Sequence, residues 1–259
     1  MSAVIEQRAP LDISNTSKVP MTRLIRVELR KMADTRAGIW LLAAIVLITA
    51  AINLIFYLTA DTSDRTFLNF MGITATPQGF LLPVLGILLV TSEWTQRTAL
   101  VSFTLTPVRI KLLIAKVVAA LLFGLAAIVA ALAIASLATL IGGADNAWQA
   151  IGIDDIGKFA LLQATGILQG LAFGLLFLNS AAAIVTYFVL PTAFSILSSL
   201  WGAMADVAPW IDLGTSQTPL FMGANLTGEQ WAQIAVGTAL WVVLPFLVGV
   251  VRVLRAELK

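Results

Sequence analysis

The sequence predicts an all-α membrane protein, in which an amphipathic interfacial helix precedes six transmembrane helices and both termini are cytoplasmic. First, 59% of the 259 residues are hydrophobic and only 12% are charged, too few to cover the surface of a soluble globule. Second, six apolar stretches are long enough to cross a bilayer. Third, all but two of the 16 Lys and Arg residues lie before the first stretch, between the second and third or at the inner end of the third, or after the last. Because basic residues accumulate beside the cytoplasmic ends of spans, these three regions are expected to lie inside.

Composition argues against several classes of function. The chain has no Cys and no His, which removes thiol nucleophiles, disulfides and imidazole catalysis. It also lacks a G-x-x-x-x-G-K-[ST] phosphate loop, so we expect no ATP hydrolysis from this chain alone. The lack of His, of paired Asp residues within the spans and of a G-x-S-x-G motif argues against a membrane enzyme. The basic residues lie beside apolar stretches, which indicates contact with membrane lipid and not with nucleic acid. No cofactor is expected within the chain.

The N-terminal part of the chain divides into a tail and a surface helix. Residues 1–20 mix Ser, Asn, Thr and Pro without periodicity and contain no apolar core, so they are expected to be a disordered tail and not a signal peptide. Residues 21–259 are expected to form one transmembrane domain. Within it, residues 21–36 place apolar and basic side chains on opposite helical faces, the pattern of a helix that lies on the inner membrane surface.

Three charged residues of this surface helix are candidate functional residues, namely Glu28, Arg30 and Lys31. Arg30 belongs to the basic face. Glu28 instead interrupts the apolar face, where an unpaired carboxylate would be costly. We expect Glu28 to pair with Lys31 three residues later, and a contact with a partner subunit is the alternative.

The six spans are predicted at residues 39–60, 79–91, 112–141, 159–178, 181–204 and 231–251. The second is short because Pro77 and Pro83 interrupt it; alternatively, it begins near Phe70 and is kinked at Pro83. The third is long, so its inner end is expected to extend into the cytoplasm, with Lys116 snorkelling to the interface.

The later connections are predicted to differ in kind. Only Asn179 and Ser180 separate the fourth and fifth spans, which favours a tight helical hairpin. Residues 205–230 are too apolar for a free loop, so they are expected to form short helices or a re-entrant segment at the outer interface.

Polar residues at depth are few. The centres of the spans carry no ionisable side chain, which argues against an ion-driven carrier. For Asn53, Gln163 and Gln169 we favour hydrogen bonding between helices, with a place in a substrate pathway as the alternative.

Small residues recur every four positions in two spans, and such stripes let helices approach closely. Packing within the subunit is favoured over a subunit interface. The stripes comprise Gly166, Gly170 and Gly174 in the fourth span and Ala127, Ala131 and Ala135 in the third.

The connection between the second and third spans is the most distinctive stretch, and residues 91–116 read TSEWTQRTALVSFTLTPVRIKLLIAK. It resembles the membrane subunits of ATP-binding cassette exporters of the type-2 permease family. In that family a similar run, with an acidic and an aromatic residue, then Thr, then Thr-Pro and a basic residue, forms a short helix that docks on the ATPase. The corresponding residues here are Glu93, Trp94, Arg97, Thr98, Pro107 and Arg109.

The resemblance implies a mechanism and a set of partners. Residues 92–111 would be a cytoplasmic coupling segment, which transmits the movement of two ATPase subunits that carry ATP and Mg²⁺. A second permease subunit, identical or homologous, would complete the substrate pathway in the plasma membrane of a bacterium. Anchoring of the charges at a headgroup interface is the alternative role for this segment. A secondary carrier or channel, a membrane enzyme and a non-transporting assembly subunit remain alternative functions.

Overall fold

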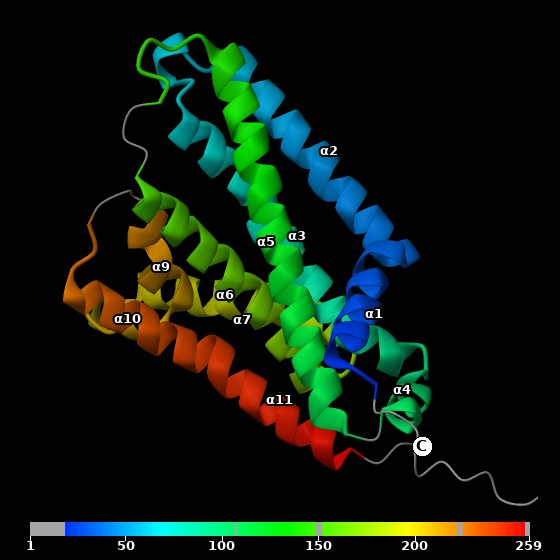
Figure 1. Cartoon of the computed structure of the whole chain (residues 1–259). Helices are drawn as coiled ribbons and strands as arrows, with labels where there is room; N and C mark the ends of the chain where they lie inside the picture. Colours follow the sequence, from blue (N-terminus) through cyan, green and yellow to red (C-terminus); the bar gives the residue numbers. More distant parts are fainter. Residues whose placement is uncertain (1–18, 107, 149–151, 222–224, 257–259) are drawn as a thin grey trace, which may run out of the picture.

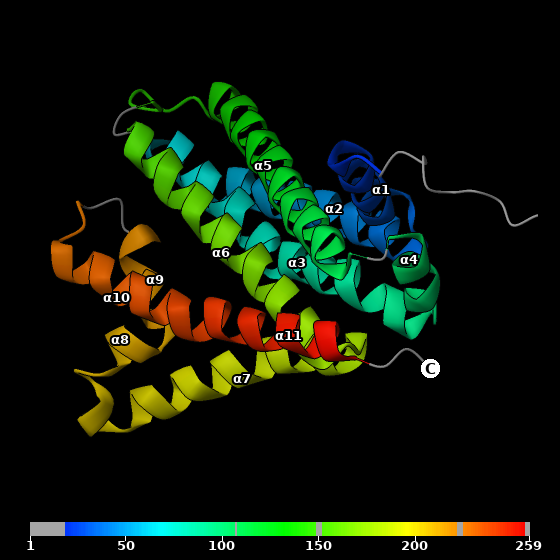
Figure 2. The same cartoon turned by 60° about the horizontal axis from the view of Figure 1, so that its bottom comes forward.

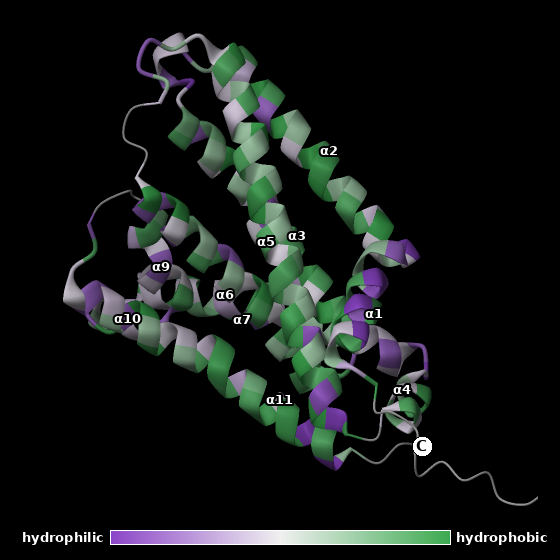
Figure 3. Cartoon of the chain, viewed as in Figure 1, coloured by the Kyte–Doolittle hydropathy of each residue, from purple (hydrophilic) through white to green (hydrophobic). Residues whose placement is uncertain are grey.

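A computed structural model describes residues 19–106, 108–148, 152–221 and 225–256, and within these ranges all regular secondary structure is helical. Six helices in the described part of the chain are long and apolar enough to cross a membrane, which supports a multi-pass membrane protein (Figure 1). Hydrophobic residues dominate their lengths, while hydrophilic residues gather mainly near the ends (Figure 3). The six are α2 (Arg36–Thr59), α3 (Phe67–Thr95), α5 (Arg109–Gly142), α6 (Ile153–Phe177), α7 (Ser180–Leu200) and the continuous helix Gly228–Arg255.

The last of these helices contains a local change of helical pitch. It consists of α10 (Gly228–Thr238), a single π-helical turn, η3 (Ala239–Val243), and α11 (Leu244–Arg255). Pro245 lies in the first turn of α11, and the wider π turn directly before it accommodates the loss of that backbone donor.

The predicted N-terminal helix is present as α1 (Met21–Asp34). Leu24, Glu28 and Met32 are its buried residues, and the helix packs on α5, α2 and α3 (Figure 2). The chain then turns at Thr35, whose hydroxyl accepts a hydrogen bond from the amide of Gly38 at the start of α2. The amphipathic helix is therefore confirmed, and its position on the inner membrane surface stays a prediction.

The second span is the longer of the two predicted alternatives. α3 is continuous from Phe67 to Thr95, with Pro77 and Pro83 inside it and the hydroxyl of Thr66 capping its first turn. Both prolines are buried. Sequence reasoning had weighted the helix-breaking tendency of proline, which neighbouring helices overcome here.

α3 and α6 form the centre of the bundle, and the glycine stripe lies between them. A Cβ added at Gly170 would lie 2.1 Å from the carbonyl oxygen of Pro83, and one added at Gly174 would lie 3.1 Å from that of Ile87. Real side chains do not fit at the first distance, so the backbones meet directly there. Ala131 and Ala135 of the alanine stripe are fully buried in a cluster around Phe70. Packing of these stripes within the chain is confirmed.

The two later connections have the predicted helical forms, and the position of residues 205–230 at the outer interface stays a prediction. α6 ends at Leu178 in the left-handed conformation, with φ +53°, and Asn179 caps α7 by accepting a hydrogen bond from the amide of Ala182. This is the tight hairpin that the sequence predicted. Between α7 and α10 lie a 3-10 turn, η2 (Gly202–Met204), and the short helices α8 (Ala208–Ile211) and α9 (Leu213–Phe221).

The chain segments separate into two ends of the bundle. α1, the short helix α4 (Ala99–Leu105) and the end of α11 gather at one, which we name the α4 end (Figures 1 and 2). The 3-10 turn η1 (Thr62–Asp64), the connection from α5 to α6, and α9 lie toward the other, which we name the α9 end. Which of the two faces the cytoplasm stays a prediction, and residues 1–18 of the predicted tail lie outside the described residues.

Candidate functional site

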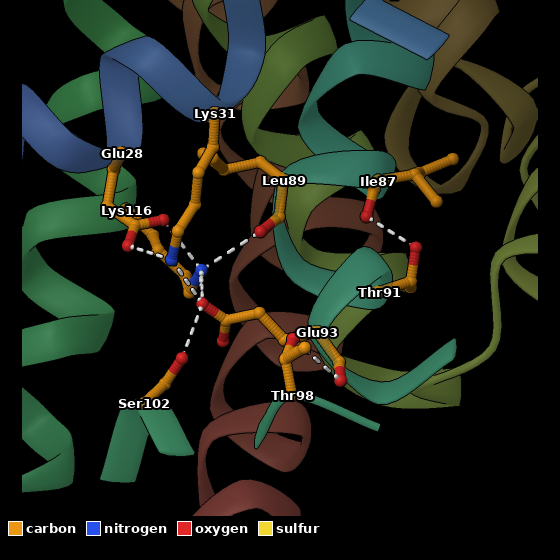
Figure 4. A network of polar contacts seen from close by, with 9 residues as sticks. All are labelled: Glu28, Lys31, Ile87, Leu89, Thr91, Glu93, Thr98, Ser102 and Lys116. Atoms are coloured by element: carbon orange, nitrogen blue, oxygen red, sulfur yellow. Dashed lines mark hydrogen bonds and ion pairs between the residues drawn. The ribbon is translucent and has the colours of Figure 1, made fainter. Parts of the chain in front are cut away.

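Four charged side chains from three helices converge at the α4 end (Figure 4). Glu28 and Lys31 come from α1, Glu93 from the last turn of α3 and Lys116 from the first turns of α5. The carboxylate of Glu28 lies 2.7 Å from the ammonium of Lys31 and, through its other oxygen, 2.7 Å from that of Lys116. One oxygen of Glu93 lies 2.5 Å from the ammonium of Lys31 and 3.1 Å from that of Lys116. We call these four residues the ion cluster.

The ion cluster is buried and its charges cancel. Glu28 is 1% exposed, Lys116 3% and Glu93 4%, while Lys31 is half-buried. Lys116 also donates to the carbonyl oxygen of Leu89 at 2.9 Å. An unpaired charge at such a site costs several kcal/mol, so each member requires the others.

The predicted environment of Lys116 is wrong. The sequence suggested that this ammonium snorkels to the membrane interface, whereas it lies inside the bundle between two carboxylates. The prediction for Glu28 was correct but incomplete, because the pair with Lys31 is present and Lys116 is an additional partner. Lys116 is 88 positions from Glu28 along the chain, and local spacing carries no information about such a contact.

The titration of Lys31, which lies outside the spanning helices, reflects its place in the cluster. Burial alone would lower the pKa of its ammonium. The neighbouring carboxylates of Glu28 and Glu93 more than offset this, so the pKa of Lys31 is raised above its ordinary value of 10.5. The ammonium is therefore charged at neutral pH.

The ion cluster also fixes α4 against the end of α3. The hydroxyl of Ser102 on α4 donates to the carboxylate of Glu93 at 3.2 Å. The amide of Thr98 donates to the carbonyl oxygen of Glu93 at 2.8 Å, and the ring of Trp94 packs 6.2 Å from that of Phe103. The turn itself requires Arg97 at φ +56°, in the left-handed region. α4 is thus a folded-back helix and not a free loop.

Arg109 fastens the other side of the α4 region. Its guanidinium donates to the carbonyl oxygens of Val253, Leu254 and Ala256, at 2.9–3.1 Å, and so occupies backbone acceptors that the end of α11 leaves open. The same guanidinium lies 5.0 Å from the centre of the Phe103 ring on α4. Arg109 therefore connects α4, α5 and α11.

The six residues predicted to dock on an ATPase consequently divide into groups. Arg97 and Thr98 are exposed. Glu93 is buried, and Trp94 and Arg109 are partly buried, each with contacts inside the chain. Pro107 lies outside the described residues. Of the three residues singled out on the surface helix, Glu28 and Lys31 belong to the ion cluster, whereas Arg30 is exposed.

A second candidate site is a cavity of about 330 Å³ near the middle of α3, α6 and α7, with α9 contributing to its wall. Gln163 and Gln169, both predicted for a substrate pathway, line it. Gln163 donates to the side-chain oxygen of Gln78 at 2.9 Å, and Gln78 donates to the carbonyl oxygen of Ala127 at 3.2 Å. The interhelical hydrogen bonding expected of Gln163 is confirmed.

The remaining two polar residues differ from Gln163. Asn53 lies outside the cavity lining and donates to the hydroxyl of Thr74 at 3.0 Å, so its expected interhelical bond is also confirmed. Gln169 is 5% exposed, and its amide nitrogen has no hydrogen-bond partner. The expected helix-to-helix bond is therefore not seen for the Gln169 amide nitrogen.

Sequence reasoning missed several residues of the two sites. Ser102 and Lys116 in the ion cluster region, and Gln78, Tyr187 and Gln217 at the cavity, had drawn no functional prediction. Gln78 offered a signal, because it is a polar residue between two prolines inside an apolar helix. For the others, only the packing of distant segments reveals the role.

Within the described residues, no group of three or more acidic, His or Cys side chains is placed to hold a metal ion. Comparisons with protein-family models, curated proteins and solved structures gave no match. Inference about function therefore depends on the residue pattern and on the geometry of the two sites.

Proposed function

We propose that this chain is the transmembrane permease subunit of an ATP-driven exporter of the type-2 family, in the plasma membrane of a bacterium. Two permease chains would pair to form the substrate pathway, and two separate ATPase subunits would bind at the α4 end, with ATP and Mg²⁺ held by those subunits. The proposal combines the resemblance of residues 91–116 with the multi-pass helical architecture.

The observation that carries the proposal is the exposed apolar face of α4. Leu100, Val101 and Leu105 are 50%, 56% and 73% exposed, although α4 lies outside the six candidate spans. The opposite side of α4 is buried through Ala99 and Phe103. An exposed apolar helix face is a contact site for a protein or for the membrane, and we assign it to the ATPase because residues 91–116 resemble the docking helix of the type-2 family.

The contacts of α4 suggest how movement would pass into the membrane. α4 bonds to Glu93 through Ser102, Glu93 pairs with α1 and α5, and Arg109 connects α4 to the end of α11. A partner that displaces α4 would therefore move the ends of several spans together. In this proposal the exposed face of α4 makes the contact, and Glu93 and Arg109 transmit it.

The proposal is tested by purifying the native complex through a tag on this chain and identifying the other chains by mass spectrometry. We expect an ATPase with a phosphate-loop motif, whose activity increases in the complex. The double variant Val101→Glu/Leu105→Glu should lose the ATPase while still inserting in the membrane. Ser63→Glu, exposed in η1 toward the α9 end, is the matched control and should retain it.

Two results would count against the proposal. One is a native complex that contains no ATPase and whose conformation does not respond to ATP. The other is transport by the isolated chain along an ion gradient, which would favour a secondary carrier. A complex with other membrane proteins and no transport would favour an assembly subunit.

A further inference from the structure

The cavity between α3, α6, α7 and α9 combines an apolar wall with hydrogen-bonding groups that the chain itself leaves unused. Its aromatic lining includes Phe80 and Phe188, whose rings stack with centres 6.4 Å apart between α3 and α7. Among the residues that the structure describes, none that lines the cavity is Asp, Glu, Lys or Arg. Its volume, about 330 Å³, lies at the lower end of the range of small-molecule sites, about 300–1,000 Å³.

Gln169 is the strongest indication of a ligand. Its side chain is almost wholly buried and lines the cavity, yet its amide nitrogen makes no hydrogen bond. Leaving a buried amide without a partner costs about 1–3 kcal/mol. Its neighbour Gln163, one and a half turns earlier on α6, is by contrast bonded to Gln78. Of the two α6 glutamines that line the cavity, Gln169 is therefore the one whose amide nitrogen is left without a partner in the chain.

Tyr187 supplies a second unused donor. Its ring packs against Phe173 and Phe188, at 6.2 Å and 5.0 Å between ring centres, and it lines the same cavity. No residue that the structure describes forms a hydrogen bond with its hydroxyl group. A phenol in an apolar site normally has such a partner.

We propose that this cavity binds an uncharged, largely apolar or aromatic molecule that carries a carbonyl or ether oxygen, which accepts hydrogen bonds from Gln169 and Tyr187. A charged ligand is disfavoured because the lining offers no opposite charge to offset its desolvation. The amide of Gln169 can present its NH₂ group to the cavity by rotation about its last side-chain bond, since neither orientation sacrifices a hydrogen bond. The identification of this ligand with the exported cargo rests on the proposed function. Binding of the ligand to the cavity is independent of that function.

Benzophenone is a suitable probe because it is uncharged, has two aromatic rings joined by one carbonyl group, and labels nearby C–H bonds on illumination. The full-length chain in lipid nanodiscs, without ATPase, is labelled, and the modified residues are mapped by mass spectrometry. We expect labelling concentrated on the cavity lining of α3, α6 and α7. 4-Methylbenzophenone serves as the carbonyl competitor, and 4-methyldiphenylmethane, which replaces its carbonyl with a methylene group, serves as the competitor of matched shape.

The hydrogen bonds predict a measurable difference between the two competitors. In the wild-type chain the carbonyl compound should compete about three- to tenfold better than its methylene counterpart, the range expected for about one hydrogen bond. In Gln169→Leu/Tyr187→Phe the two compounds should compete equally. The variant retains the apolar wall, so residual labelling of the cavity also reports that it is folded.

A second pair of variants tests the location of the site. Gly79 lines the cavity and Gly72 does not, and a Cβ at either position of α3 meets nothing within 4 Å. Gly79→Leu should fill the cavity and abolish labelling of its lining, whereas Gly72→Leu should not affect it.

Three results would overturn the proposal: labelling spread evenly over lipid-facing residues, equal competition by the two compounds in the wild-type chain, or unchanged labelling in Gly79→Leu. Because the labelling experiment contains no ATPase, these outcomes do not test the proposed ATPase partner. That partner is tested by purification of the native complex. Conversely, suppose that the probe labels the cavity specifically but the native complex contains no ATPase. The binding site would then be supported, and the proposed role as an exporter subunit would be contradicted.

Discussion

At the scale of single residues, the ion cluster shows how four charges can be kept inside an apolar bundle. Glu28, Lys31, Glu93 and Lys116 sum to zero charge, and each member pairs with both members of opposite charge. Removing one member leaves a net charge in a largely buried site, which is worse than removing an oppositely charged pair.

We therefore expect Lys116→Met to destabilise the chain by about 3–5 kcal/mol, as removal of one partner from a buried pair typically does. Glu28→Gln/Lys116→Met should recover much of the loss, because it leaves Lys31 and Glu93 to pair with each other. Thermal unfolding of the purified chain in detergent measures both variants. A double variant no more stable than Lys116→Met would contradict this account of the cluster.

The raised pKa of Lys31 predicts a pH dependence. A group whose pKa is higher in the folded chain contributes its full stability below its unfolded value, near 10.5, and loses it as the pH rises through the folded value. The difference in melting temperature between the wild-type chain and Lys31→Met should thus be constant up to about pH 10. It should then shrink at higher pH, and a difference that instead grows would show that the sign is wrong.

At the scale of elements, the contact between α3 and α6 depends on Gly170. Alanine there would place its Cβ 2.1 Å from the carbonyl oxygen of Pro83, and the backbone cannot move away without separating the helices. We expect Gly170→Ala to cost about 1–3 kcal/mol through overpacking. Gly72→Ala on α3, where a Cβ meets nothing, should be neutral or slightly stabilising because alanine favours helix. Equal melting temperatures for the two variants would contradict the close contact.

The elements were largely predictable from the sequence, and the reasons are local. The length of the apolar stretches indicates the spans. The separation of apolar and basic side chains onto opposite helical faces in residues 21–36 indicates α1, and the short connection at Asn179 indicates a hairpin. The second span was placed less well because proline propensity is a local rule, whereas the continuity of α3 depends on buried contacts with α5 and α6.

The sites were less predictable than the elements, because they depend on pairs far apart in the chain. The sequence marked Glu28 as anomalous and Glu93 as part of a motif. Nothing in the sequence indicated that both carboxylates pair with Lys116. It likewise singled out Gln163 and Gln169 without showing that one is bonded and the other is not. Burial and partner identity arise only from tertiary packing, which periodicity does not encode.

At the scale of the whole molecule, the distribution of basic residues predicts the orientation in the membrane. The chain lacks cysteine, so single-cysteine variants can be labelled without background. Thiol reagents that cannot cross the membrane should modify Ser63→Cys and Asp145→Cys in intact cells, and Thr98→Cys only after permeabilisation. All three positions are exposed in the structure. The inverse pattern would place α4 outside and would remove the basis for ATPase docking.

The tight contacts of α6 limit how the molecule can change shape. Its Gly170 meets the backbone of α3, and a Cβ at Gly249 of α11 would lie 2.5 Å from the Cβ of Leu175 on its other flank. Helices joined this closely cannot slide past one another without breaking both contacts, so α3, α6 and α11 should travel as a rigid block. α7, whose membrane-spanning residues are mostly not buried within the chain, is then the least buried of the long helices that line the cavity. Widening or narrowing of the cavity would accordingly begin at the hairpin around Asn179, as a hinge motion of one helix against three.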